Sequence, residues 1–249
     1  MFDVTAIGEA LIDLTQTGLS ASGVAEYAAN PGGAPANLAV AAAKLGASTA
    51  FIGRVGTDAF GTQLRECLRA NGVDVSRMLT DAQRPTTLAV VSLDSRGERS
   101  FSFYRQHSAD LALSPDDVPD EALRRTHFFH FGGVSLTANP ARDTVLDAAR
   151  RARNLGACVT YDPNYRPALW GSRKARRVRV TDKTFRAYSP FMAIYRREWN
   201  EILKVPVYLL NGVLGAMMLP KNSDAYRMTK QVAKAIQNEA EKAVAAISS

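Results

Sequence analysis

The sequence predicts an α/β protein built on a parallel sheet with helices on both faces. Short apolar runs alternate with helical segments through the first two thirds of the chain, and several of the runs end in glycine. Such alternation is typical of open sheets whose ligands bind at the carboxyl ends of the strands. The predicted strands are Val4 to Gly8, Ala47 to Val55, Thr126 to Phe131 and Ala157 to Tyr161, and the predicted helices are Leu38 to Leu45, Asp58 to Ala70 and Asn139 to Arg153.

Charge divides the chain into two regions. The net charge of the 249 residues is +7, but residues 1–172 carry 16 Lys and Arg against 18 Asp and Glu. Residues 173–249 carry 15 against 6, so the basic character belongs to this tail. We therefore expect a main domain over residues 1–172, a largely helical tail of unrelated character over 173–249, and no nucleic-acid partner.

The cysteine and histidine positions argue against a metal site. Cys67 and Cys158 lie far apart without the spacing of metal ligands, which favours a reduced, cytoplasmic protein. His127 and His130 are three residues apart on a predicted strand, so they face opposite sides and cannot chelate one ion together. The chain starts with no basic segment followed by an apolar run, so we expect no secretory signal.

A glycine pair, Gly32 and Gly33, precedes the first helix. Glycine is used where the backbone needs a positive φ or where a ligand touches the main chain. Pro35 suits the first helical turn, and the Asn37 amide points from that turn toward whatever lies over the glycines. An amide both donates and accepts, which suits a hydroxyl-rich ligand. A tight turn into a buried helix explains the same residues equally well.

Further candidate ligand groups lie next to predicted strands. Asp13 follows the first strand and is our candidate acceptor for the hydroxyls of a polyol, the alternative being a solvated loop acid. The segment from Asp162 to Arg166 follows the last strand. Arg105 ends a predicted hairpin and can form a forked pair with a hydroxyl or a carboxylate, the alternative being a solvated arginine.

That hairpin joins Thr86 to Leu93 with Arg99 to Tyr104 through a turn at Gly97. It interrupts the alternation of strands and helices, so we expect it to project from the main sheet. Phe101 and Phe103 lie on one of its faces, which needs cover from a ligand or from a second subunit.

Residues 1–172 resemble the PfkB (ribokinase-like) carbohydrate kinases, and most closely the bacterial fructokinases. Several motifs in the same order carry the resemblance: Gly8-Glu9-Ala10-Leu11-Ile12-Asp13, Pro31-Gly32-Gly33-Ala34-Pro35-Ala36-Asn37, Phe51-Ile52-Gly53-Arg54-Val55-Gly56-Thr57-Asp58, Gly72-Val73-Asp74, Gly97-Glu98-Arg99 with Phe103-Tyr104-Arg105, Ala109-Asp110-Leu111, and Asp162 to Trp170. The resemblance implies a ribokinase-like parallel sheet with a small β lid, and ATP-dependent phosphorylation of a sugar's primary hydroxyl, with fructose as the best candidate. It also implies Mg²⁺ and a homodimer formed through the lid.

The resemblance assigns sugar-binding roles to Asp13, Gly32, Gly33, Asn37 and Arg105. It places Asn164 and Arg166 on the sugar and phosphate side of the cleft. The family's Gly-Ala-Gly-Asp segment, which supplies the anion hole and the catalytic base, has no counterpart in residues 173–249, where the nearest glycine pair is Gly212 and Gly215. We therefore assign no catalytic or ATP-binding residue, and we expect a fold that is incomplete on its C-terminal side.

Three functions remain open at this stage. The first is a fructokinase-type kinase that is truncated and weak or inactive. The second is an active kinase whose tail completes the nucleotide site in an unrecognised way. The third is a sugar-binding remnant, or a membrane-surface or interaction protein on a kinase-derived scaffold. The membrane-surface alternative arises because residues from Ser223 onward form an amphipathic pattern.

Overall fold

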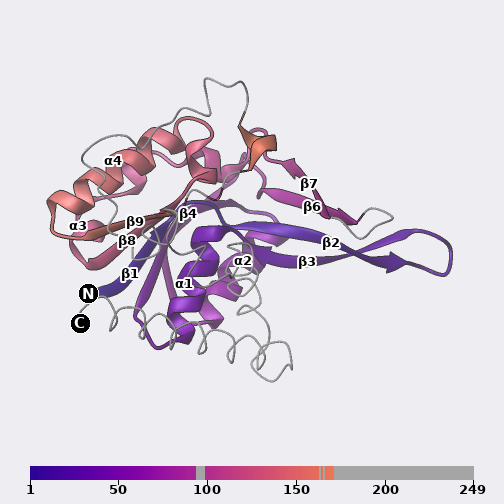
Figure 1. Ribbon diagram of the computed structural model, residues 1–249, viewed down its shortest axis with the longest axis horizontal. Helices are drawn as coiled ribbons and strands as arrows, with labels where there is room; N and C mark the ends of the chain where they lie inside the picture. The colour runs from indigo at the N-terminus through magenta and orange to yellow at the C-terminus, as the bar shows by residue number, and fades with distance from the viewer. Residues whose placement is uncertain (94–98, 163, 165, 171–249) are drawn as a thin grey trace, which may run out of the picture. The chain divides into compact units, whose positions relative to one another are not determined.

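The main sheet of the protein is parallel, as predicted. The computed structural model describes residues 1–93, 99–162, 164 and 166–170. Within these residues the sheet has five strands in the order β5-β4-β1-β8-β9 (Figure 1). The strands are β1 (Phe2–Ile7), β4 (Thr49–Gly56), β5 (Val73–Asp81), β8 (Thr126–Gly132) and β9 (Cys158–Asp162). Strand β5 escaped prediction because its sequence lacks apolar alternation and exposes Ser76, Arg77 and Thr80.

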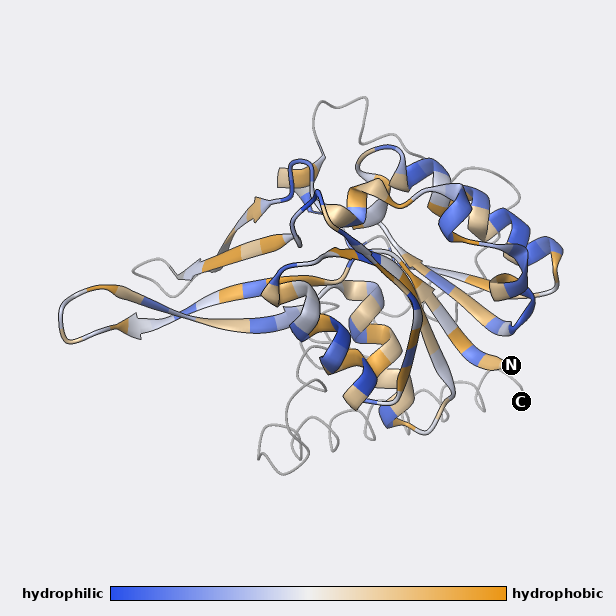
Figure 2. Cartoon of the chain, turned by 180° about the vertical axis from the view of Figure 1, so that it is seen from behind, coloured by the Kyte–Doolittle hydropathy of each residue, from blue (hydrophilic) through white to orange (hydrophobic). Residues whose placement is uncertain are grey.

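Helices cover both faces of this sheet. On one side lie α1 (Ala34–Lys44) and α2 (Ala59–Ala70), and on the other lie α3 (Asp120–Arg124) and α4 (Ala141–Asn154) (Figure 1). Phe129 and Phe131 of β8 pack with Val145 of α4 in a cluster whose members are fully or almost fully buried. Figure 2 shows the hydrophilic residues of α4 on the side that faces away from the sheet. Burial of the apolar stripe of α4 therefore fixes this helix to the sheet.

A second sheet carries the predicted hairpin. Its order within the described residues is β3-β2-β6-β7, and Figure 1 shows it reaching away from the main sheet. The strands are β2 (Leu11–Leu19), β3 (Ala25–Gly32), β6 (Leu88–Leu93) and β7 (Arg99–Tyr104). The antiparallel pairing of β6 with β7 confirms the hairpin. Asp13, which was predicted to follow the first strand, lies inside a strand of its own, because β2 pairs with β3 and β6 from Leu11 and Ile12 onward.

Strands β2 and β3 were missed because their sequences look unlike strands. Much of β2 is polar, and β3 combines alanines with a proline near its end. The two strands pair with each other, and β2 also pairs with β6, so pairing rather than burial of alternate apolar side chains orders them. Tertiary context therefore decides their conformation.

The motif around Asp58 joins the two sheets. As predicted, Asp58 caps α2 by accepting a hydrogen bond from the Gly61 N–H at 2.8 Å. The same carboxylate accepts from the backbone N–H and the hydroxyl of Thr86, both at 2.8 Å, just before β6 begins. The cap of a core helix thus also holds the strand that leads into the second sheet.

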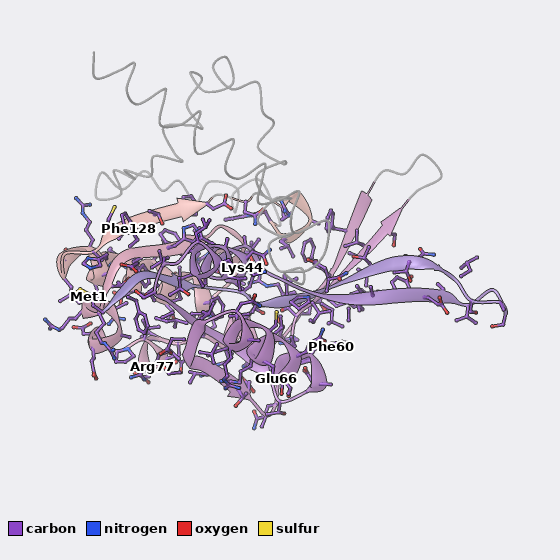
Figure 3. All side chains as sticks on the ribbon, turned by 90° about the horizontal axis from the view of Figure 1, so that it is seen from below. Met1, Lys44, Phe60, Glu66, Arg77 and Phe128 are labelled. Atoms are coloured by element: carbon purple, nitrogen blue, oxygen red, sulfur yellow. The ribbon has the colours of Figure 1, made fainter. Side chains whose placement is uncertain are left out.

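The two histidines of β8 lie in different surroundings. His127 is exposed, whereas His130 is buried and shares a 2.9 Å hydrogen bond with the Thr160 hydroxyl. Burial lowers the pKa of His130 to about 4, so this ring is neutral at physiological pH. Figure 3 shows the neighbouring Phe128, which is 45% exposed, well away from Phe60 and Glu66 of α2.

Several sequence-based predictions concern residues outside the described ranges. These are the hairpin turn at residues 94–98 and the whole tail from 173 to 249, with its glycine pair and its amphipathic stripe. Among the described residues, no helix has the length and apolar character needed to cross a bilayer.

Candidate functional site

Asp13 lies in β2, directly over the glycine pair. Its register partner on β3 is Asn30, and Leu11, two residues earlier, is paired with Gly32. A side chain at position 32 would occupy the space that the Asp13 carboxylate fills, because an added Cβ would overlap Oδ2. Only glycine at position 32 therefore allows the carboxylate to rest against the β3 backbone.

Burial controls the charge of Asp13. It raises the pKa of this carboxyl to about 6, and the nearby positive charge of Arg166 lowers that pKa in part. Asp13 is thus a half-buried acid, so the alternative of a solvated loop acid is wrong. A carboxylate that has lost part of its water shell gains much from hydroxyl donors.

Gly33 begins α1 in a conformation that suits glycine. Its φ is +103°, and an added Cβ would strike the backbone carbonyl of Glu9. The Asn37 N–H then donates to the Gly33 carbonyl at 2.8 Å, which closes the first helical turn. The side-chain Oδ1 of Asn37 is buried and has no hydrogen-bond partner among the described residues. The segment is a tight turn that also presents an unsatisfied acceptor.

Asn164 and Arg166 follow β9 at the same edge of the sheet. Asn164 has a φ of +33°, and its backbone N–H donates to the Asp162 carboxylate at 3.0 Å. Its Oδ1 is also buried without a partner in the part of the chain that the structure describes. Burial raises the pKa of Asp162, and the charge of Arg166 lowers it in part. The Arg166 guanidinium lies 6.0 Å from the centre of the Phe101 ring on β7.

Close backbone packing connects these two groups of residues. A Cβ added to Gly132, at the end of β8, would lie 3.3 Å from Pro35 in the first turn of α1. Gly132 is in turn the register partner of Asp162 on β9. The carboxyl ends of β8 and β9 therefore meet the start of α1, as expected for a ligand site in a parallel sheet. Six of the seven predicted sugar-site residues come together in this way: Asp13, Gly32, Gly33, Asn37, Asn164 and Arg166.

The side chain of Arg105, the seventh predicted residue, forms hydrogen bonds with other residues of the same chain. It is 5% exposed, and its Nε and Nη2 donate to one oxygen of Asp110 at 2.8 and 2.6 Å. Its Nη1 donates to the Val134 carbonyl at 3.0 Å. The alternative of a solvated strand-end arginine is thus wrong, and the forked pair is made with Asp110. A contact between Arg105 and the sugar stays a prediction.

Sequence reasoning missed Glu9 as part of this region. Glu9 is 1% exposed and contacts both α1 and the short 3₁₀ helix η3 (Val134–Leu136). Its position directly after β1 was a usable signal, because the carboxyl end of a central parallel strand points into the ligand crevice. Of the two carboxylates in the Glu9–Asp13 segment, only Asp13 was taken as a candidate ligand group.

The model of the pfkB family of carbohydrate kinases matches residues 1–239. The chain belongs to this family. The match extends past residue 172, where the sequence motifs stop, so the domain boundary placed there stays a prediction.

Curated relatives of this pfkB protein are named fructokinases. Fructokinase-1 of Oryza sativa subsp. japonica is 44% identical over 179 residues, which cover 71% of this chain and 55% of that protein. The fructokinase of Solanum tuberosum is 40% identical over 183 residues, covering 72% of this chain and 57% of its own length. The chain therefore spans a little more than half the length of the curated relatives it matches.

Solved structures show the same fold. The crystal structure of fructokinase from Xylella fastidiosa aligns with a TM-score of 0.67 and 38% identity over 70% of this chain and 55% of that one. The same enzyme with bound ATP aligns with a TM-score of 0.65 and 37% identity over 70% of this chain and 53% of that one. Fructokinase from Vibrio cholerae O395, in its fructose, ADP and calcium ion bound form, aligns with a TM-score of 0.61 and 36% identity. This alignment covers 69% of this chain and 53% of that one. These matches confirm the ribokinase-like α/β fold.

We predict that Asp13→Asn stabilises the protein at pH 7.5. The folded pKa of about 6 lies above the 3.8 of an ordinary aspartate, so the ionised carboxylate costs folding free energy. The stability associated with the protonated acid is complete below pH 3.8 and is lost as the pH rises through 6. The substitution should therefore add about 1–3 kcal/mol to the free energy of unfolding at pH 7.5 and almost nothing at pH 4.

Urea denaturation at the two pH values measures this difference. Asp116→Asn is the matched control, because Asp116 is exposed. An Asp13→Asn variant no more stable than wild type at pH 7.5 would show that the carboxylate is well solvated.

We also predict that Gly33→Ala is far more damaging than Gly46→Ala. Both glycines have similar positive φ values, +103° and +100°. Apart from its chain neighbours, however, no described residue has a heavy atom within 4 Å of a Cβ at position 46. Gly46→Ala should therefore cost only the backbone strain, about 1–2 kcal/mol. Gly33→Ala adds a collision with the Glu9 carbonyl and should cost more than about 3 kcal/mol. Equal losses in thermal unfolding would contradict the close contact between Gly33 and Glu9.

Proposed function

We propose that this chain is a sugar kinase of fructokinase type, which transfers a phosphoryl group from ATP to the primary hydroxyl of a ketohexose. The observation that carries the proposal is the desolvated Asp13 carboxylate over Gly32. The glycine pair leads into the first turn of α1, where the buried Asn37 Oδ1 has no hydrogen-bond partner among the described residues. Fructose is the first candidate, because a structural neighbour is described with bound fructose. Family membership supports the class of reaction.

The proposed sugar contacts follow from the chemistry of the side chains. The Asp13 carboxylate accepts hydrogen bonds from sugar hydroxyls, which replace the water that burial has removed. The Oδ1 atoms of Asn37 and Asn164 are buried acceptors that need donors, and hydroxyls supply them. Gly32 and Gly33 shape the site by leaving room for the Asp13 carboxylate and the Glu9 carbonyl, where a side chain would otherwise lie.

ATP and Mg²⁺ enter the proposal through the family. When bound, ATP supplies the phosphoryl group and the metal ion neutralises its developing charge. Among the residues with a described position, the Arg166 guanidinium suits phosphate oxygens. No three His, Cys, Asp or Glu side chains in those residues are grouped so that they could hold a metal ion. We assign no further residue to the nucleotide or the metal.

The second sheet supports a proposed homodimer. The sheet and the turn between β2 and β3 expose large apolar side chains, with exposed fractions between 41% and 66%: Leu19, Val24, Tyr27, Phe101 and Tyr104. Such side chains favour burial against a second copy of the same sheet. Sedimentation equilibrium of the full chain tests this, and a monomer at all concentrations would contradict it. The cytoplasmic location and the membrane contact of the tail stay predictions.

The function is tested by measuring sugar binding and phosphoryl transfer separately on the full chain. We expect fructose to bind in isothermal titration calorimetry, and Asp13→Ala to weaken that binding at least roughly tenfold, since it removes charge-assisted hydrogen bonds. Asp116→Ala serves as the control at an exposed position and should change nothing. Transfer is measured with ATP, Mg²⁺, fructose and a small panel of sugars.

The outcomes separate the candidate functions. Binding with transfer, both lost in Asp13→Ala, supports the kinase. Binding without transfer supports a sugar-binding protein derived from a kinase. Absence of both would refute the proposed function, and lipid-dependent sedimentation lost on deletion of residues 173–249 would then favour the membrane-surface alternative.

A further inference from the structure

Glu9 is a buried acid to which the family resemblance gives no role. It directly follows β1 and is 1% exposed. Its Oε1 accepts a hydrogen bond from the backbone N–H of Ala34 at 3.3 Å, and its Oε2 accepts one from the Ser135 hydroxyl at 2.6 Å. The two oxygens of one carboxylate thus join the start of α1 to η3.

The start of α1 needs a cap from outside the helix. Its N-cap residue is Gly33, which has no side chain, and Pro35 has no N–H to offer. The Ala34 N–H is one of the orphan donors at a helix N-terminus, and Glu9 accepts it from 25 residues upstream. A carboxylate is also the group that the positive end of a helix dipole favours. Glu9 therefore replaces the missing local cap.

The surrounding packing leaves little freedom for this arrangement. A Cβ on Gly33 would strike the Glu9 carbonyl, and a Cβ on Gly8 would strike the Ser135 hydroxyl. A Cβ on Gly8 would also lie 2.9 Å from Pro35. Three glycine-dependent contacts thus bring the end of β1, the start of α1 and η3 within van der Waals distance, and the Glu9 side chain supplies the polar bonds between them.

Burial raises the pKa of Glu9, and the Ser135 hydrogen bond and the charge of Arg105 oppose that rise. Arg105 itself is paired with Asp110 at 2.6 Å. Glu9 is thus held mainly by neutral donors on the two segments that it joins. Its removal would take the acceptor from the buried Ser135 hydroxyl and from the part-buried Ala34 N–H.

We propose that Glu9 is a positioning residue that fixes the turn from Gly33 to Asn37 against η3, and so holds the sugar-facing backbone and the Asn37 amide in place. This inference rests on the proposed function, because the turn matters for ligand affinity only if the sugar binds there. Glu9 itself does not touch the sugar in this account.

Three variants separate positioning from simple stability. In Glu9→Gln the amide oxygen can accept from Ala34 and the NH₂ can donate to Ser135, so the fructose Kd should stay within roughly threefold of wild type. In Glu9→Ala both bonds are lost and the Kd should rise at least roughly tenfold, measured by calorimetry well below the melting temperature. Ser135→Ala removes one bond and should raise the Kd roughly threefold to fivefold.

Amide hydrogen exchange on the same variants gives a readout that needs no ligand. In Glu9→Ala, exchange at Ala34 and Asn37 should accelerate at least roughly tenfold, whereas the first turn of α2, which Asp58 caps, should be unchanged. If Glu9→Ala fails to fold, Ser135→Ala should show the same localised effect at smaller size.

The possible results are distinct. Variants that melt earlier but bind fructose as tightly as wild type would overturn the proposal, because Glu9 would then be structural only. Unchanged exchange at Ala34 and Asn37 would overturn it as well. If wild type itself binds no fructose, the proposed function fails, and the exchange data still decide whether Glu9 fixes the turn.

Discussion

The site depends on the absence of side chains at Gly32 and Gly33. Position 32 must be glycine because the Asp13 carboxylate lies where a Cβ would be. Position 33 must be glycine because the Glu9 carbonyl occupies the corresponding space there. These two contacts bring β2, β3 and α1 together at the carboxyl edge of the main sheet. Burial raises the pKa of Asp13, which rests against Gly32.

The buried acids around this edge are each compensated differently. Asp110 has a charged partner in Arg105 and accepts further hydrogen bonds from Thr87 and Ser108, both at 2.6 Å. Glu9 has neutral donors from two segments. Asp13 has the charge of Arg166 nearby and keeps a raised pKa. A group that its own chain leaves poorly satisfied is a good candidate to meet a ligand, whereas the first two are part of the framework.

Sequence reasoning predicted the parallel sheet because its core strands are short apolar runs that end in glycine. It predicted Asp13 and Asn37 as candidate site residues because polar residues beside glycines at strand ends are informative by themselves. It missed β2, β3 and β5, whose order comes from pairing with neighbouring strands rather than from an apolar pattern. It also did not foresee that Arg105 pairs with Asp110, since spacing along the chain does not show which acid a buried arginine meets.

The central claim is that Asp13 is a desolvated carboxylate poised for sugar hydroxyls, and its titration tests that claim most directly. The carboxyl ¹³C chemical shift of Asp13, followed by NMR against pH, should give a pKa of about 6. Fructose should lower that pKa, because hydroxyl donors favour the ionised form. Asp3 is the internal reference, since its hydrogen bonds from Ser48 keep its pKa below the ordinary 3.8. An Asp13 that titrates near 3.8 and ignores fructose would contradict the account.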